Sequence, residues 1–72
     1  MALKTAKDIG ALIRAIRKQS HLTQKELAAA SGLGDRFIRE LEKGKPSCQL
    51  EKTLQVLHML GIKLTATTPI NK

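Results

Sequence analysis

The chain has 72 residues, enough for one small domain, and its formal net charge is +7. A single cysteine, Cys48, excludes an intramolecular disulfide, and no run approaches the roughly 18 apolar residues of a membrane span. We therefore expect a cytoplasmic, single-domain protein with no membrane segment, whose basic surface favours a polyanionic partner.

The first predicted helix covers residues 6–19 and is amphipathic. Thr5 and Asp8 have the spacing of a capping box, in which each side chain accepts a hydrogen bond from the other residue's backbone N–H. The apolar positions recur at the helical period, at Ile9, Leu12, Ile13 and Ile16. The opposite face carries the bases Lys7, Arg14, Arg17 and Lys18. We expect Arg17 and Lys18 to extend a footprint on phosphates.

Two short helices joined by a tight turn are predicted over residues 24–31 and 35–43. Thr23 and Glu26 have capping-box spacing at the first of them, and the glycine after it can take the left-handed conformation that ends a helix. We predict that Gly32 ends the first helix of the pair, that Gly34 is the N-cap of the second helix and that Gly44 ends it. The wedge between the helices is filled by Leu27, Leu33, Ile38 and Leu41, with the small Ala28 at the crossing. This spacing is that of a helix-turn-helix unit, which can lay its second helix in the DNA major groove.

A fourth predicted helix begins after Pro46 and Ser47, runs to Leu60 and is closed by Gly61. Its apolar stripe consists of Leu50, Leu54, Leu57 and Leu60, widened by Val56 and Met59. A stripe of Leu and Met at this spacing is more typical of a core than of a ligand site. We therefore expect it to pack against the rest of the domain.

Residues 62–67 alternate apolar and polar side chains, which predicts a β-strand. A lone strand in a helical domain lacks a partner, so we expect it to pair with the same strand of a second subunit; a frayed tail is the alternative. The predicted dimer interface is Leu57, Leu60, Ile62, Leu64 and Ala66. Residues 1–67 then form one DNA-binding and dimerisation domain, and residues 68–72 a flexible tail.

Two stretches of the chain carry a family resemblance. LTQKELAAASGLGDRFIRELEKGKP resembles the lambda repressor/Cro-like (Xre) helix-turn-helix regulators. The continuation SCQLEKTLQVLHMLGIKLTATTP resembles the HipB-type antitoxin branch, in which short terminal strands pair across the dimer. The resemblance implies an all-α, lambda-repressor-like bundle of four to five helices with a short C-terminal strand pairing across a homodimer.

The predicted contacts with double-stranded DNA lie on the helix-turn-helix unit. Gln24, at a helix N-terminus, can meet a phosphate, and the family uses the glutamine of its matching TQ pair in this way. Arg36 and Arg39 lie one turn apart, and either can bind guanine O6 and N7 bidentately or contact a phosphate instead. The full predicted set is Thr23, Gln24, Gly34, Asp35, Arg36, Arg39, Lys43 and Lys45, with the lysines at the phosphate backbone.

Two residues of the second helix leave alternatives open. Asp35 departs from the glutamine or serine that is commoner at this place in the family. Its carboxylate could accept a hydrogen bond from cytosine N4, hold a neighbouring arginine, or favour the helix N-terminus. Phe37 could contact a thymine methyl group or a partner protein, but we favour a place in the core.

The sequence gives little support for an enzyme. His21, His58 and Cys48 lack the spacing of a zinc site, and we predict no metal and no cofactor. The carboxylates Glu40, Glu42 and Glu51 are interpreted as helix-surface charges beside basic residues. Cys48, in the first turn of the fourth predicted helix, could have a lowered thiol pKa, although a small filler residue is the favoured interpretation.

These observations favour a dimeric, sequence-specific repressor that binds a palindromic operator. The resemblance implies the autoregulatory antitoxin of a toxin–antitoxin operon with a HipA-like kinase toxin as partner. A stand-alone or phage-type repressor without a toxin is the first alternative. The second is a protein-binding adaptor in which the helix-turn-helix unit is only a scaffold.

Overall fold

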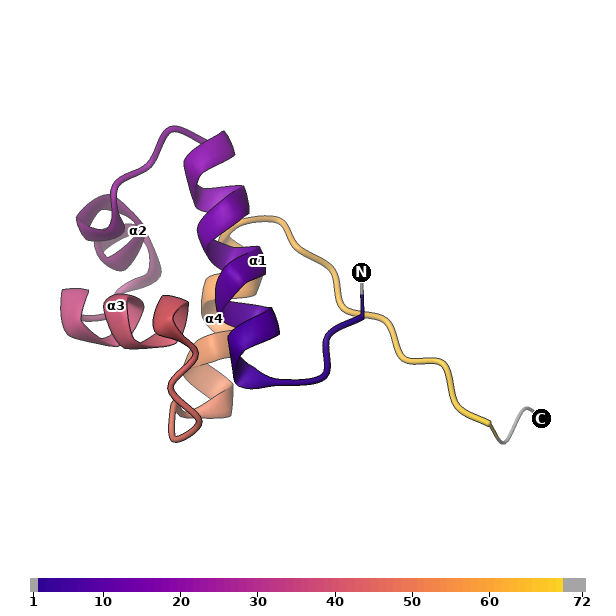
Figure 1. The fold of residues 1–72 in the computed structure, drawn as a ribbon. Helices are drawn as coiled ribbons and strands as arrows, with labels where there is room; N and C mark the ends of the chain where they lie inside the picture. Colours follow the sequence, from indigo (N-terminus) through magenta and orange to yellow (C-terminus); the bar gives the residue numbers. More distant parts are fainter. Residues whose placement is uncertain (1, 70–72) are drawn as a thin grey trace.

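The structure is a computed structural model, and it describes residues 2–69. Four helices occur in this part of the chain: α1 (Ala6–Gln19), α2 (Gln24–Ser31), α3 (Asp35–Lys43) and α4 (Leu50–Met59). α3 packs against both α1 and α2, and α2 also contacts α4. The segments before α1 and after α4 both run on the side of the molecule away from α2 and α3 (Figure 1). This arrangement confirms the predicted all-α, helix-turn-helix bundle.

The local signals at the first two helices act as predicted. The Thr5 hydroxyl accepts a hydrogen bond from the Asp8 N–H at 3.1 Å, and the Asp8 carboxylate accepts from the N–H groups of Thr5 and Lys4. The donors of Lys4 and Thr5 lower the pKa of the Asp8 carboxyl. A second capping box joins Thr23 and Glu26 at α2, with distances of 2.8 and 3.0 Å. Both predicted starts are confirmed.

The glycines that end α2 and α3 adopt the left-handed conformation. Gly32 has φ +69° and Gly44 has φ +82°, values that a Cβ would make costly. Gly34 is the N-cap of α3 and offers no side-chain cap. His21, in the turn between α1 and α2, also has a positive φ of 59°, which the sequence did not reveal.

The core lies where the four helices meet. Its buried apolar residues are Ile13, Leu27, Ala28, Ile38, Leu41, Val56 and Leu57. Half-buried apolar side chains pack around them: Ile9, Leu33, Phe37, Cys48, Leu60 and Ile62. Phe37 thus lies against the core as expected, and the ammonium of Lys52 lies 5.9 Å from its ring centroid. The predicted wedge of the helix-turn-helix unit is confirmed.

Gly10 allows the close approach of α1 and α3, a role that periodicity did not indicate. A Cβ built there would overlap the carbonyl oxygen of Leu41 and lie 2.9 Å from that of Glu42. Since both obstacles are backbone atoms, a larger residue would force the two helices apart.

α4 differs from its prediction in both its start and its buried face. It begins at Leu50, because Pro46 occupies a turn closed by a hydrogen bond from the Cys48 N–H to the Lys45 carbonyl at 3.3 Å. Proline suits the second position of such a turn as well as the first turn of a helix, so the sequence signal was ambiguous. Cys48 therefore precedes α4.

The buried face of α4 is Thr53, Val56 and Leu57. The predicted stripe was wrong for Leu50, which is 70% exposed, for Leu54, which is 45% exposed, and for Met59, which is 47% exposed. Thr53 can be buried because its hydroxyl donates to the Gln49 carbonyl at 2.9 Å. That bond lets a polar residue face the core while leucines face outward.

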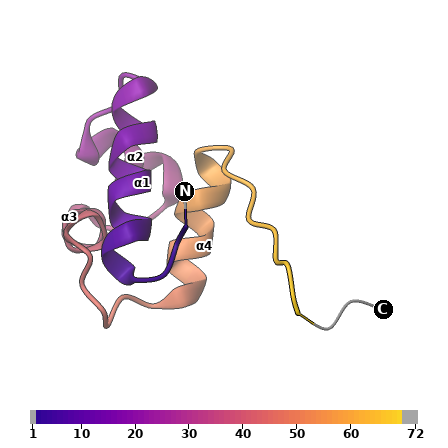
Figure 2. The same ribbon diagram turned by 45° about the vertical axis from the view of Figure 1, so that its right-hand side comes forward.

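The segment after α4 leaves the helical body. The Ile62 N–H still bonds to the Leu57 carbonyl at 2.9 Å, after which the chain runs away from the helices (Figures 1 and 2). No strand occurs in residues 62–67 of this single chain, so the pairing with a second subunit stays a prediction. Residues 70–72 of the predicted tail lie outside the described residues.

Candidate nucleic-acid interface

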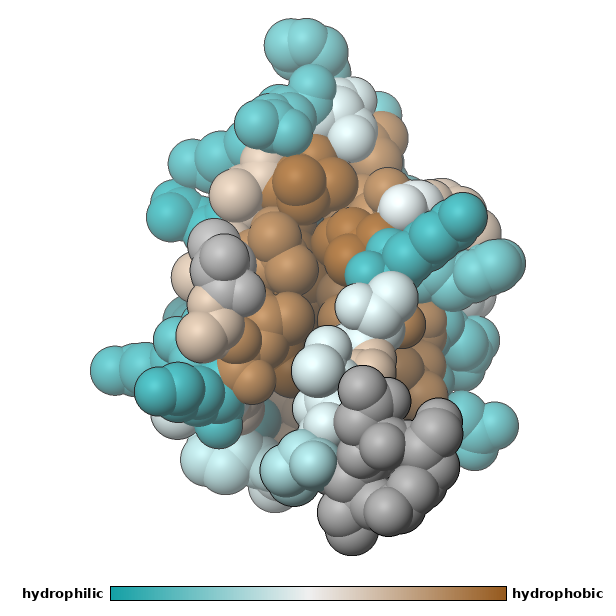
Figure 3. Space-filling view, turned by 90° about the vertical axis from the view of Figure 1, so that its right-hand side faces the viewer, coloured by the Kyte–Doolittle hydropathy of each residue, from teal (hydrophilic) through white to brown (hydrophobic). Residues whose placement is uncertain are grey.

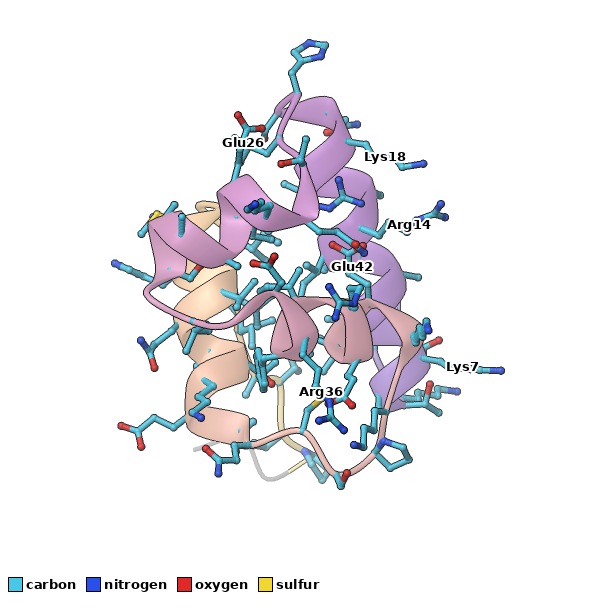
Figure 4. The ribbon with its side chains drawn as sticks, turned by 90° about the vertical axis from the view of Figure 1, so that its left-hand side faces the viewer. Lys7, Arg14, Lys18, Glu26, Arg36 and Glu42 are labelled. Carbon is cyan, nitrogen blue, oxygen red and sulfur yellow. The ribbon has the colours of Figure 1, made fainter. Side chains whose placement is uncertain are left out.

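The outer face of α3 is basic. Ile38 and Leu41 anchor the helix in the core, and Arg36, Arg39 and Lys43 are exposed on the other side. Asp35 and Gly34 lie at its N-terminal end, where Asp35 is half-buried. Figure 4 shows this side of the molecule, with α2 and α3 in front and Arg36 below α3. Because these side chains are exposed, α3 can contact a nucleic acid through them without any change in the fold.

One acidic residue interrupts this basic face. The Oε2 atom of Glu40 lies 3.2 Å from the Arg36 Nε and 3.2 Å from the Lys45 Nζ. The hydrogen bonds from Lys45 and Arg36 lower the pKa of the Glu40 carboxyl. The Arg36 side chain remains 81% exposed, so this pair is a solvated one that a ligand can displace.

A buried ion pair lies behind the basic face. The Arg17 Nε and Nη2 donate to both oxygens of Glu42, at 2.6 and 3.0 Å, and its Nη1 donates to the Leu22 carbonyl at 2.7 Å. Glu42 also accepts from the Gln24 side-chain amide at 3.1 Å. The hydrogen bonds with Glu42 raise the pKa of Arg17. A single carboxylate thus joins α1, α2 and α3.

This pair corrects two predictions. Arg17 is only 7% exposed and is not on the outer face with Lys18, and the Glu42 side chain is 3% exposed rather than a surface charge. A signal was present in the sequence. Arg17 follows the buried Ile13 by four residues, and Glu42 follows the buried Ile38 by four, so each belongs to an apolar face.

A hollow of about 380 Å³ opens between α1, α2 and α3. Its walls are formed by Arg14, Gln24, Arg39, Glu42 and Lys43. Sequence reasoning assigned Gln24, Arg39 and Lys43 to DNA, but it assigned neither Arg14 nor Glu42 to this surface. Figure 4 places Arg14 on the outer edge of α1 between Lys7 and Lys18, next to the Glu42 site. Only the packing of α1 on α3 brings it to this surface.

A smaller hollow of about 150 Å³ lies between the start of α1, the end of α3 and the start of α4. Its lining is mostly apolar and includes Ile9, Pro46, Cys48 and Leu50. Burial, together with the charge of Glu40, raises the pKa of the Cys48 thiol. The alternative of a thiol with a lowered pKa is therefore wrong, and Cys48 is a packing residue.

The predicted dimer residues are distributed unevenly. Leu57 belongs to the chain's own core, Leu60 and Ile62 are half-buried, and Leu64 and Ala66 are exposed. The large apolar side chains most open to solvent are Leu50, Leu54, Met59 and Leu64. Figure 3 shows apolar side chains gathered on the face from which the C-terminal segment departs, opposite the face of Figure 4.

Within residues 2–69, no group of three or more His, Cys, Asp or Glu side chains is placed to hold a metal ion. The helices in the same range are all too short or too polar to cross a membrane.

Comparison of the sequence with protein-family models identifies the family of the chain. The helix-turn-helix family model HTH_3 matches residues 13–66, which is most of the chain. The chain belongs to the helix-turn-helix family of transcriptional regulators. This result confirms the predicted Xre-like membership.

Two curated relatives are similar to this chain over most of their length. The "Uncharacterized HTH-type transcriptional regulator y4mF" of Sinorhizobium fredii is 51% identical over 67 residues, covering 93% of this chain and 88% of that protein. The "ImmF control region 10 kDa protein" of Bacillus phage phi105 is 33% identical over 66 residues, covering 89% of this chain and 73% of that protein.

Solved helix-turn-helix structures share the fold at lower identity. The "HipB-O4 20mer complex" matches with a TM-score of 0.85 at 20% identity, covering 97% of this chain and 99% of that chain. The "Structure of HipA-HipB-O2-O3 complex" matches with a TM-score of 0.86, also at 20% identity and with 97% of this chain covered. The fold of this regulator is therefore that of HipB.

Proposed function

We propose that this regulator is a cytoplasmic, dimeric repressor that binds a palindromic operator on double-stranded DNA, its own promoter included, and acts without catalysis. The observation that carries the proposal is the exposed basic face of α3, a helix whose opposite face is buried in the core through Ile38 and Leu41. Bound at a promoter, the dimer would repress transcription by excluding the polymerase.

Within this proposal, Arg36 reads sequence. Its side chain is 81% exposed, and among residues 2–69 it is held only by Glu40 on its own helix, so the guanidinium can leave that partner for the O6 and N7 atoms of a guanine. Such a bidentate contact discriminates against other bases by roughly 1–3 kcal/mol. Thr23 and Gln24 approach a phosphate at the start of α2, and Gly34 and Asp35 form the leading end of α3 in the groove. Lys43 and Lys45 approach the DNA backbone.

The dimer is supported by the apolar face on the far side of the molecule. Leu54, Met59 and Leu64 leave large apolar side chains in solvent at the end of a domain that already has a core. Pairing of residues 62–67 with the same segment of a second subunit would cover them, with Leu57 and Leu60 supporting the contact from below and Ile62, Leu64 and Ala66 within it. A two-fold axis there would present two α3 helices to successive major grooves.

We further propose that the repressor is the antitoxin of a HipA-like kinase. The fold match to HipB structures, one of them described as a complex with HipA, supports this assignment. The second candidate is a stand-alone or phage-type repressor, which the similarity to the Bacillus phage control-region protein favours. A protein-binding adaptor is less well supported, since it would not require an exposed basic α3.

The base-reading role is tested by Arg36→Ala. Selection from random duplexes gives the preferred site, and titration by fluorescence anisotropy gives the ratio of cognate to scrambled affinity. We expect Arg36→Ala to lower that ratio by about 10-fold or more, since one bidentate contact is lost. Lys52→Ala, on α4, is the matched control. An unchanged ratio would contradict the assignment, and a wild-type protein without sequence preference would favour the adaptor.

The antitoxin role is tested by capture of the tagged protein from its host at endogenous level, read by mass spectrometry. A stoichiometric kinase-like protein would support the antitoxin. Recovery of the protein with a specific DNA fragment and no kinase would support the stand-alone repressor.

A further inference from the structure

We infer that the hollow between α1, α2 and α3 is a seat for one phosphodiester of the DNA backbone, and that Arg14 of α1 is one of its ligands. This inference rests on the proposed function but assigns a site that the recognition helix alone does not contain. It also divides the two exposed arginines of α3 between different tasks.

The geometry brings three helices to one opening. Arg14 comes from α1, Gln24 begins α2, and Arg39 and Lys43 come from α3, all around a space of about 380 Å³. A space of this size exceeds a single phosphate group, so it can admit the backbone on either side of it as well. The seat lies beside the outer face of α3, where the DNA backbone must pass when α3 enters the groove.

The charge in this hollow is uncompensated. Its one acid, Glu42, already accepts hydrogen bonds from two guanidinium nitrogens of Arg17 and has a side chain only 3% exposed. Among residues 2–69, no ion pair is formed by Arg14, Arg39 or Lys43, whereas Arg36 and Lys45 share Glu40. Three cations that converge without a counter-charge favour an anion that supplies it.

Gln24 adds an oriented neutral donor. Its side-chain amide nitrogen donates to Glu42 at 3.1 Å, which fixes the amide against the wall of the hollow. The second hydrogen on that nitrogen is left for a phosphate oxygen, so the buried Arg17–Glu42 pair acts as a positioning group for the seat.

Arg39 and Arg36 therefore differ in task. Arg39 lines the hollow with Arg14 and Lys43, whereas Arg36 is not among the residues that form its walls. We assign Arg39 to the phosphate and Arg36 to the bases. Sequence selectivity then depends on Arg36, while the register of α3 on the duplex depends on the seat.

The test compares Arg14→Ala with Lys7→Ala. Both remove one exposed positive charge from α1, but Lys7 does not line the hollow. Binding of each variant to a selected duplex and to a random-sequence duplex is measured over a range of salt concentrations. We expect Arg14→Ala to weaken both duplexes by the same factor, about 10-fold, and to reduce the slope of log affinity against log salt by about 0.9. We expect Lys7→Ala to change either affinity less than about threefold.

Duplexes with a single neutral methylphosphonate locate the phosphate. Neutralising the seated phosphate should weaken the wild type more than it weakens Arg14→Ala, which keeps only Gln24, Arg39 and Lys43 at the seat, whereas all other positions should affect both proteins alike. Equal behaviour of Arg14→Ala and Lys7→Ala at every position would overturn the seat. A wild-type protein without sequence preference would instead contradict the proposed function. The seat is tested separately, because its effect on affinity is measured on selected and random-sequence duplexes alike.

Discussion

The two halves of this molecule differ in how much they need a partner. Around α1, α2 and α3, the capping boxes are formed, the buried charges are paired, and Gly10 and Gly44 lie where two backbones approach closely. On the other side, α4 turns Leu50 and Leu54 to solvent, and the segment after Ile62 runs away from the helices. The half that we propose reads DNA is complete in one chain, and the half that we propose dimerises is not.

The largest effect is expected from removing the Glu42 carboxylate, which joins α1, α2 and α3. Glu42→Ala leaves Arg17 buried at 7% exposure without its counter-charge. Loss of one partner of a buried pair costs about 3–5 kcal/mol, which approaches the total stability of a domain this small. We expect urea unfolding followed by circular dichroism to show a largely unfolded variant.

A matched control for this variant replaces both partners, as Arg17→Met with Glu42→Leu. Since no charge is then left unpaired, we expect the double variant to recover most of the lost stability. Equal instability of the single and double variants would mean that the site depends on shape rather than on charge.

The next largest effect is expected from a substitution in the segment after α4, which we propose forms the dimer interface. Leu64→Asp places a charge on a side chain that is 48% exposed in one chain and that we propose is covered in the dimer. We expect dimer dissociation, measured by analytical ultracentrifugation, to rise by about 10-fold or more, while the thermal midpoint of the monomer changes little. Thr65→Asp is the control from the other side of the segment. Dimers of unchanged stability in Leu64→Asp would place the interface elsewhere.

The smallest effect concerns the tuning of the basic face. Glu40→Gln removes the acid that Arg36 and Lys45 share, so both cations become free to meet DNA. We expect a few-fold gain in affinity for random-sequence duplexes and a salt slope steeper by about 0.9. Glu51→Gln, on α4, controls for net charge. A loss of affinity seen only for duplexes that carry a C·G pair at one position would instead show that Glu40 accepts a hydrogen bond from cytosine N4.

The difference between the halves also explains what sequence reasoning could find. The bounds of α1, α2 and α3 depend on neighbours in the chain, such as the pair of Thr5 and Asp8 or the left-handed Gly32, and these were predicted. The start of α4 was missed because Pro46 suits a turn and a helix equally. Its buried face was missed because the hydroxyl of Thr53 donates to the carbonyl four residues earlier. A hydropathy value takes no account of such a hydrogen bond, so it does not indicate that this threonine can be buried.

The candidate site divides in the same way. The exposure of Arg36 and Arg39 follows from their spacing relative to Ile38 and Leu41 along one helix, so periodicity predicted it. The presence of Arg14 beside Arg39 depends on the crossing of α1 over α3, which Gly10 permits. No pattern within a single helix contains that information, and only the packed fold supplies it.

The carboxylate of Glu42 also affects which partner must change shape on binding. Because it belongs to α3 and binds Arg17 of α1 and Gln24 of α2, it ties the three helices to one another. In the dimer that we propose, helices tied in this way cannot follow an irregular groove, so the duplex has to bend or twist to bring both half-sites into reach. Operators would then differ in affinity through the stiffness of central base pairs that no side chain touches.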